Sequence, residues 1–401
     1  MATTSTRKTA RTTGLDFTGG KVFDGPEGEN ARVHVQLVDP GAWSLPYDHA
    51  LAGGLARAGA DVELVTSRFV HGAPPPVEGF EVSERFYRRA TAPGRGRGAR
   101  RLMRAAEHLP DMVRYRSYTR TADVRHYQWL PLEALDALLL PPARPRVLTV
   151  HNTLRRGGGA REPVTRRLVR LMDALVVHAR AGANELVERF GADPERVHVI
   201  PHGAFEHLTR LPLERPLPPE LEAVDGPVIL CFGLVRPYKG VDVLLEAFQQ
   251  LEGAELWVVG LPHMDMTALR ASAERARGRV RFVERFVEDA ELPAYFRRAD
   301  VVVLPHRRID QSGVLSTALA FGKPIVASAV GGFAEVASDH GAAVTVPPGD
   351  SGALREALER LLADPGQRDA LAARATAAAA GPYSWDEAAR QTLALYERLI
   401  G

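Results

Sequence analysis

The sequence P-V-I-L-C-F-G-L-V-R-P-Y-K-G-V-D-V-L-L-E-A, at residues 227–247, decides the fold that we expect. It begins with an apolar run of strand length, and apolar residues return at helical spacing after the turn. Gly233 allows the backbone to turn tightly as it leaves the strand. Arg236 and Lys239 place two cations beside the N-terminus of the coming helix, where free backbone N–H groups also gather. This strand–turn–helix unit suits a diphosphate.

Taken alone, two such cations are more often solvated loop charges. A second stretch, at residues 300–336, favours the phosphate interpretation: D-V-V-V-L-P-H-R-R-I-D-Q-S-G-V-L-S-T-A-L-A-F-G-K-P-I-V-A-S-A-V-G-G-F-A-E-V. It predicts a buried strand at 301–304, a polar loop, a helix at about 312–321 and a strand at 324–327. The chain thus repeats the order of strand, polar loop and helix.

Together the two stretches resemble the nucleotide-sugar half of the retaining glycosyltransferases of family 4, which have the GT-B fold. The matching segments are F-G-L-V-R-P-Y-K-G with L-L-E-A-F, and A-L-A-F-G-K-P-I-V-A-S with G-G-F-A-E-V. Their combination in this order is far more specific than any one segment. The resemblance implies an α/β protein with two Rossmann-like domains, whose parallel sheets face a central cleft.

Length and composition agree with a two-domain globular protein. The chain has 401 residues, of which 45% are hydrophobic and 25% charged. The formal net charge of +2 gives no indication of nucleic acid as a partner. The single cysteine, Cys231, excludes an internal disulfide and a cysteine-based metal site. No apolar run is long enough to span a bilayer and no signal-peptide core is evident, so we expect a cytoplasmic protein, with contact at the inner membrane face left open.

The predicted domains follow from changes in composition. Residues 1–30 lack apolar periodicity and predict a mobile leader. We expect an N-terminal acceptor-side domain at 31–210, and a linker at 211–226 whose prolines stiffen it and bar regular structure. The nucleotide-sugar domain would then span 227–382, and a closing helix at 383–401 would cross back to the first domain.

The resemblance assigns the donor site residue by residue. Gly233, Arg236 and Lys239 would hold the diphosphate, and Arg285 and Phe286 lie where relatives hold the nucleobase. The backbone N–H groups of Ser312, Gly313 and Val314 would bind the sugar or the phosphates, with Thr317 nearby.

The chain departs from the family at one point in this half. Many family members have two glutamates eight positions apart, and here Ile309 and Thr317 occupy those places. Asp310, one residue later than the first, is our candidate to replace it on the hydroxyls of the donor sugar. Thr317 would bind more weakly than a carboxylate, because a carboxylate can grip two hydroxyls.

The first half offers candidates for the acceptor. Where relatives have a glycine pair after the first strand, this chain has the residues 45–49, L-P-Y-D-H. Tyr47, Asp48 and His49 are candidates for holding the acceptor. An equally open interpretation is that they are turn and cap residues, with Asp48 as the N-cap of the following helix.

Two further candidates follow the next strands. His151 comes directly after a strand at 146–150, and residues past the carboxyl ends of parallel strands face the ligand crevice. Family members have a histidine here near the transferred sugar, which the resemblance carries over to His151; a histidine satisfied by local backbone is the alternative. Of the residues on the strand at 124–129, Gln128 is the better acceptor candidate and His126 the better core residue.

The segment Arg88–Arg104 is strongly basic and glycine-rich. Our first interpretation is a solvated, mobile loop before a helix. The alternative is attraction to an anionic membrane or a phosphorylated acceptor, because each basic residue near an acidic surface contributes about 1 kcal/mol. The segment lacks interleaved aromatic residues and any nucleic-acid motif, so we expect no nucleic-acid partner.

The predicted reaction follows from the charges that must be stabilised. Departure of a nucleoside diphosphate leaves positive charge on the anomeric carbon and negative charge on the phosphate, which Arg236 and Lys239 would stabilise. The proposed catalytic set is His151, Asp310, Arg236 and Lys239, with a UDP- or GDP-type sugar as substrate, no cofactor and no metal. Retention is implied by the resemblance. Two alternatives stay open: a non-catalytic sugar-nucleotide-binding protein, which the missing glutamates favour, and a GT-B epimerase or phosphorylase.

Overall fold

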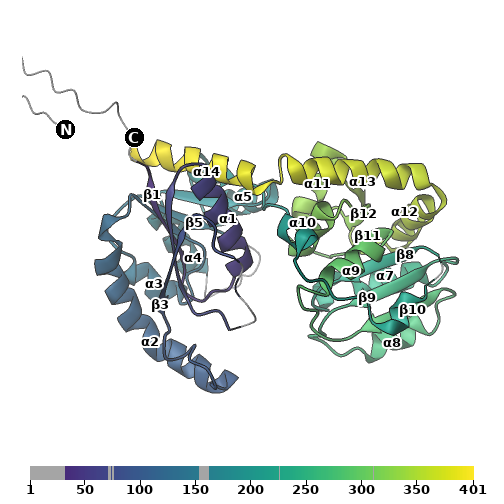
Figure 1. The fold of residues 1–401 in the computed structure, drawn as a ribbon. Coiled ribbons are helices and arrows are strands. Elements are labelled where there is room, and N and C mark those ends of the chain that lie inside the picture. Colours follow the sequence, from purple (N-terminus) through teal and green to yellow (C-terminus); the bar gives the residue numbers. More distant parts are fainter. Residues whose placement is uncertain (1–31, 71–73, 75, 153–161, 225, 310) are drawn as a thin grey trace, which may run out of the picture. The chain divides into compact units, whose positions relative to one another are not determined.

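The computed structural model describes residues 32–70, 74, 76–152, 162–224, 226–309 and 311–401. Two parallel β-sheets organise them (Figure 1), with strand orders β3-β2-β1-β4-β5-β6-β7 and β10-β9-β8-β11-β12-β13. In both sheets the chain starts at a central strand, winds outward to one edge and then returns to wind outward to the other. This doubly wound order confirms the predicted α/β class. The predicted leader at 1–30 lies outside the described residues.

The first sheet and its helices span the N-terminal half. Its strands are β1 (His34–Asp39), β2 (Asp61–Ser67), β3 (Glu81–Phe86), β4 (Val124–Tyr127), β5 (Arg146–Thr149), β6 (Ala174–Val177) and β7 (Val197–Val199). The helices along this half are α1 (Leu45–Arg57), α2 (Arg97–Tyr118), α3 (Glu133–Leu139), α4 (Glu162–Leu171) and α5 (Arg180–Glu188).

Alternate residues of the strands bury opposite faces of this sheet. Leu148 and Val150 pack in one hydrophobic cluster with residues of α2, α4 and α5. Val147 packs in the other cluster, with α1 and with the C-terminal helix α14 (Trp385–Ile400), which runs alongside α1 in Figure 1. Covered strands of a parallel sheet are usually apolar, as Ala174–Val177 is, but β1, β2 and β4 also contain the buried polar residues Gln36, Glu63 and Arg125.

The second sheet is built in the same way. Its strands are β8 (Val228–Phe232), β9 (Glu255–Val259), β10 (Arg279–Val283), β11 (Val301–Leu304), β12 (Ile325–Ser328) and β13 (Val344–Val346). The helices along this half are α7 (Val241–Phe248), α8 (Thr267–Ala273), α9 (Leu292–Arg298), α10 (Gly313–Ala320), α11 (Gly331–His340), α12 (Ser351–Ala363) and α13 (Pro365–Ala380). Leu230 faces α9, α10 and α11, whereas Cys231 faces α7 and α12 as a small core residue.

Several predicted boundaries are wrong. Helix α1 begins at Leu45, with Ser44 at the N-cap position, so Asp48 lies inside its first turn and is not the cap. Helix α2 begins at Arg97, which makes part of the arginine-rich segment helical instead of a loop. Strand β4 ends at Tyr127 and not at 129. In each case the backbone hydrogen bonds of the helix or strand begin or end at a residue that the pattern of apolar side chains does not mark.

The predicted linker at 211–226 runs between β7 and β8. Its prolines do not bar regular structure, because Pro219 starts a one-turn helix, α6 (Pro219–Glu222), where the missing N–H of proline costs nothing. At the other end of the chain, Ser384 caps α14 by accepting a hydrogen bond from the N–H of Glu387. Arg57 of α1 pairs with Asp386 of α14 at 2.6 Å.

Gly240, at the start of α7, provides a test of this packing. Its φ is +68°, and a Cβ atom there would lie 1.9 Å from the carbonyl oxygen of Pro305. We expect Gly240→Ala to lower the free energy of unfolding by about 3 kcal/mol or more, because backbone must move in addition to the left-handed strain. The matched control is Gly253→Ala, where φ is +74° but nothing lies within 4 Å, and where strain alone should cost about 1–2 kcal/mol. Urea denaturation of both variants measures the difference; equal losses would contradict the close approach at Gly240.

Candidate active site

The topology places the ligand crevice of each sheet beside its first strand, where the winding direction reverses. In the second sheet this point lies between β8 and β11. Residues that follow these two strands line a cavity of about 420 Å³, within the usual size range of ligand sites. The sequence-predicted donor residues that line it are Gly233, Arg236, Lys239, Ser312, Gly313, Val314 and Thr317.

Two cations face this donor cavity. Lys239 is only 8% exposed, and its Nζ donates to the carbonyl oxygen of Phe232 at 3.4 Å. Burial lowers the pKa of Lys239, since the charged form has lost most of its water. The Nε of Arg236 is buried and has no hydrogen-bond partner among the described residues. Neither side chain therefore has a carboxylate partner in the part of the chain that the structure describes. An anion in the cavity would supply the missing acceptors.

Glycine at 233 makes room for the lysine. Its φ is +96°, and a Cβ atom at this position would lie 2.8 Å from the Lys239 Nζ. The turn after β8 therefore needs glycine for its conformation and for space.

The N-terminus of α10 forms another wall of the donor cavity. Ser312 is the N-cap residue, and its side chain makes no capping hydrogen bond. The N–H groups of the first turn, from Gly313 onward, therefore have no partner within the helix. Thr317 donates its hydroxyl proton back to the carbonyl oxygen of Gly313 at 2.9 Å. Its oxygen can still accept a hydrogen bond from a ligand.

The other predicted donor residues lie elsewhere. Arg285 is exposed and pairs with Glu291 at 2.7 Å, and Phe286 is 59% exposed. Neither lines the donor cavity. Asp310 lies outside the described residues, whereas its neighbour Ile309 does line the cavity. The roles of Arg285, Phe286 and Asp310 stay predictions.

His306 is a residue beside this site that the sequence reasoning missed. It follows β11 by two positions, is 2% exposed, and neither ring nitrogen makes a hydrogen bond of ordinary geometry among the described residues. Burial and the charge of Lys239 lower its pKa to about 3, so the ring is neutral at physiological pH. The rule that singles out His151, a polar residue just past a buried parallel strand, also applies to His306.

In the first sheet, His151 and Gln128 come together. The His151 Nε2 lies 3.1 Å from the Gln128 Oε1, and its Nδ1 lies 3.3 Å from the Nε2 of His178. His178 Nδ1 must donate to the carbonyl oxygen of Ile200 at 3.0 Å, because a carbonyl only accepts. The bare Nε2 of His178 faces His151 Nδ1 as an acceptor, and the Gln128 Oε1, which also only accepts, faces His151 Nε2. His178 thus orients the predicted catalytic histidine.

Buried aromatic and imidazole rings surround this pair. Tyr47 lies 4.8 Å from the His151 ring centroid at right angles, and 5.1 Å from that of His202. Burial lowers the pKa of His178 to about 4 and that of His202 to about 3. His126 is also buried, between the Tyr396 hydroxyl at 2.6 Å and the Thr149 hydroxyl at 2.7 Å, which confirms it as a core residue.

The other two acceptor candidates, Asp48 and His49, do not contact His151 as Tyr47 and Gln128 do. Asp48 is wholly buried, and the Ser44 hydroxyl bridges it to Asp39 at 3.2 and 3.5 Å. Burial and the nearby charge of Asp39 hold the pKa of Asp48 well above its ordinary value. His49 packs edge-on against Phe80 and lines a different cavity, of about 350 Å³. Asp48 and Gln128 are both 0% exposed, so a direct contact of either side chain with an acceptor would require exposure that this arrangement does not give.

The buried neutral histidines predict a pH dependence of stability. The folded-state pKa of His178, about 4, is below the unfolded value of about 6.5. The unfolded chain therefore binds the proton first, and stability falls as pH drops below about 6.5. Between pH 7 and pH 5 this one group should remove about 2 kcal/mol. We expect His178→Gln to lose stability less steeply than wild type over this interval in urea titrations; parallel curves would show that His178 takes up its proton in the folded state.

Two comparisons with known proteins identify the family. The model for glycosyl transferases group 1 matches residues 226–364, and the model for Glycosyltransferase Family 4 matches residues 47–204. A D-inositol 3-phosphate glycosyltransferase of Xylanimonas cellulosilytica is 33% identical, over 93% of this chain and 96% of the relative. The chain belongs to glycosyltransferase family 4. A second D-inositol 3-phosphate glycosyltransferase, of Kineococcus radiotolerans, is 29% identical over 87% of this chain and 89% of the relative.

Solved structures agree on the GT-B fold of this family 4 glycosyltransferase. Anabaena HepE, in complex with UDP and glucose, has a TM-score of 0.68 at 18% identity and covers 92% of this chain and 100% of that one. Sucrose-phosphate synthase of Thermosynechococcus elongatus has a TM-score of 0.67 at 22% identity, covering 92% and 99%. At these identities the likeness supports the fold alone.

Two features of the glycosyltransferase concern the described residues as a whole. None of their helices combines the length and the apolar character needed to cross a membrane. Within the same residues, no group of three or more His, Cys, Asp or Glu side chains is arranged to hold a metal ion.

Proposed function

We propose that this glycosyltransferase moves a sugar from a nucleoside diphosphate sugar to a hydroxyl acceptor, without a metal and with retention of anomeric configuration. The observation that supports it most is the donor cavity, where Arg236, Lys239 and the uncapped N-terminus of α10 surround one space. Such a set neutralises a diphosphate with side chains and backbone dipoles. It also binds the departing diphosphate more strongly than the intact donor, because the negative charge grows as the bond breaks.

Retention is proposed from the family resemblance and from the composition of the cavity. A retaining glycosidase uses two carboxylates, one as nucleophile and one as acid. Asp289 is the only carboxylate among the described residues that line the donor cavity. The proposal therefore has the acceptor attack on the face from which the diphosphate departs. The phosphate takes the acceptor's proton, and His151 lies near the transferred sugar.

The donor and the acceptor are proposed from the relatives. HepE was solved with UDP, which makes UDP-sugars the first donors to test, followed by GDP-sugars. The relatives named for D-inositol 3-phosphate make that compound the first acceptor to assay. The proposal places the reaction in the cytoplasm, with Arg88–Arg104 as the segment that would meet an anionic membrane.

A panel of nucleoside diphosphates and their sugars tests the donor site. A ligand at a hundred times its dissociation constant stabilises a protein by about 2.7 kcal/mol, so UDP or GDP should raise the melting temperature measurably. We expect Arg236→Ala to abolish this shift. Arg275→Ala is the control. It removes the same charge, but Arg275 is exposed and does not line the donor cavity. An undiminished shift in Arg236→Ala would exclude the proposed diphosphate site.

The second test separates transfer from binding. His151→Ala should reduce transfer by roughly 100-fold or more, if loss of a positioned hydrogen-bonding group costs what it does elsewhere. The same variant should keep the thermal shift with UDP, because His151 does not line the donor cavity. His263→Ala, which removes an exposed imidazole, is the control and should transfer at the wild-type rate.

One observation favours a second function, a sugar-nucleotide-binding protein without transferase activity. Ile309 and Thr317 stand where many family members have glutamates. Donor binding with no transfer to any acceptor by wild type, and no hydrolysis of the donor, would support this function over the first.

A further inference from the structure

A cavity of about 770 Å³ lies apart from the donor cavity and shares no lining residue with it. One wall is helix α2, which contributes Arg100, Arg101 and Arg104. The opposite wall comes from the segments after β1 and β4, with Trp43, half exposed, and Leu132. We call it the arginine pocket. Its volume suits a small-molecule ligand, and its walls combine cations with apolar surface.

The three arginines have no hydrogen-bond or ion-pair partner among the described residues. The Nε atoms of Arg100 and Arg104 are buried without a partner, and the Arg104 guanidinium lies 5.7 Å from the ring centroid of Tyr87. None of the described residues that line the pocket is a carboxylate. A guanidinium is always charged, and a buried donor without an acceptor is costly. An anion would supply the missing acceptors.

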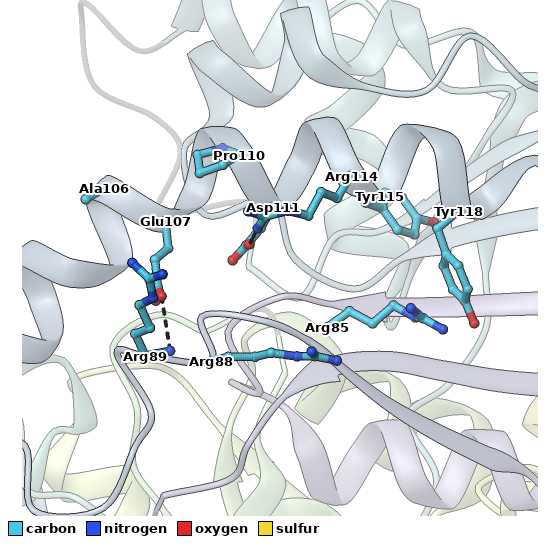
Figure 2. A pocket seen from close by; sticks show the side chains of 10 residues that line it. All are labelled: Arg85, Arg88, Arg89, Ala106, Glu107, Pro110, Asp111, Arg114, Tyr115 and Tyr118. Atoms are coloured by element: carbon cyan, nitrogen blue, oxygen red, sulfur yellow. Dashed lines mark hydrogen bonds and ion pairs between the residues drawn. The ribbon is translucent and has the colours of Figure 1, made fainter.

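The neighbouring cavity on α2 shows the ordinary alternative (Figure 2). It has a volume of about 450 Å³ and is lined by arginines and by two carboxylates, Glu107 and Asp111. There Arg114 pairs with Asp111 at 2.7 Å, and Glu107 accepts the N–H of Arg89 at 3.0 Å. Two carboxylates thus offset part of the charge of the four arginines in that cavity, and the Arg88 Nε donates to the carbonyl oxygen of Glu84 at 2.9 Å.

The floor of the arginine pocket is held rigidly. The Tyr87 hydroxyl lies 2.6 Å from His108 Nδ1, and His108 Nε2 lies 2.6 Å from the Asp136 carboxylate. The carboxylate keeps the imidazole proton on Nε2, so that Nδ1 accepts from the tyrosine. Tyr87, His108 and Asp136 are all buried. Tyr87 also has a φ of +51°, a strained conformation for a residue other than glycine, and such strain is concentrated at functional sites.

Aromatic side chains join the arginine pocket to the transfer site. The Trp43 ring packs edge-on against that of Trp129, with centroids 5.5 Å apart. Trp129 in turn stacks on His151 at 5.1 Å and an interplanar angle of 16°. Trp129 is fixed in place, since its Nε1 donates to the Ser44 hydroxyl at 2.9 Å. An apolar surface therefore separates the cations from the histidine.

We propose that the arginine pocket binds the anionic end of the acceptor, an amphiphile with a phosphate or carboxylate group at Arg100 and Arg104. An apolar or aromatic segment lies over Trp43 and Trp129 and brings the reacting hydroxyl to His151. This assignment rests on the proposed function, because it names the acceptor class of the same transfer. The proposed acceptor differs from a cyclitol phosphate, in which the phosphate and the hydroxyls share one compact polar ring.

Binding of octyl phosphate, measured by calorimetry at fixed ionic strength, tests the pocket directly. We expect at least tenfold weaker binding in the double variant Arg100→Ala/Arg104→Ala. The matched control is Arg116→Ala/Arg120→Ala, which removes two exposed charges from the end of the same helix and the turn after it. Inorganic phosphate should bind at least tenfold more weakly than octyl phosphate, and neutral octyl glucoside more weakly than either, if both cations and apolar walls contribute.

Two further arms separate the sources and the hypotheses. Co-sedimentation with vesicles containing 30 mol% phosphatidylglycerol, lost only in Arg100→Ala/Arg104→Ala, would support the pocket with a lipid as its source. Binding of octyl phosphate without co-sedimentation would support it with a soluble acceptor. UDP should raise the melting temperature of this double variant as it does that of the wild type, which also shows that the variant folds. If UDP does not raise the melting temperature of the wild type, that result counts against the proposed function and not against the pocket.

Equal affinity of octyl phosphate for the two double variants would overturn the proposal. So would inorganic phosphate binding as tightly as octyl phosphate, because the apolar walls would then contribute nothing. Efficient transfer to D-inositol 3-phosphate, unchanged in Arg100→Ala/Arg104→Ala, would show that the acceptor's anionic group binds elsewhere.

Discussion

Lys239 is a buried ammonium at the carboxyl end of a central strand, with only a carbonyl oxygen as partner among the described residues. Desolvation of such a group is expensive, and no described carboxylate compensates it. Two glycines of the surrounding structure hold this charge in place. Gly233 leaves space for the Lys239 Nζ, and Gly240 allows the chain to pass close to the Pro305 carbonyl group at the start of α7. An uncompensated cation at the point where the winding of the sheet reverses, which is where ligands bind in such folds, favours an anionic ligand.

The doubly wound sheet serves two different purposes in this chain. In the second sheet it presents backbone N–H groups and two cations, which in the proposed function bind a diphosphate. In the first it presents rings: His151 lies between Trp129, Tyr47 and His178. The buried, neutral His178 donates to the Ile200 carbonyl oxygen and turns its Nε2 toward His151. In the proposed reaction, one half therefore supplies charge for the leaving group, and the other supplies orientation for the transferred sugar and the acceptor.

Much of this could be predicted from local patterns, and the rest depends on contacts that are distant in sequence. Strand 228–232 and the α10 helix follow from apolar periodicity, because each is a local property. The cavity that gathers Gly233, Arg236 and Val314 was accessible through the family resemblance. By contrast, Asp48 has the pattern of a cap residue, and only the tertiary structure reveals it buried beside Asp39.

The polar relay of Tyr87, His108 and Asp136 was missed for the same reason. Its members are separated by 21 and 28 positions, and nothing in the sequence near each one distinguishes it from a surface residue. The arginines of α2 suggested a solvated loop, because their lack of partners can be recognised only when the surrounding walls are known.

The central claim is that Arg236, Lys239 and the N-terminus of α10 hold the donor's diphosphate. A crystal structure of the protein with UDP tests it most directly. The account predicts phosphate oxygens within about 3 Å of the Arg236 guanidinium, the Lys239 Nζ and the N–H groups of Gly313 or Val314. UDP bound elsewhere, or a diphosphate in this cavity that touches neither cation, would contradict it.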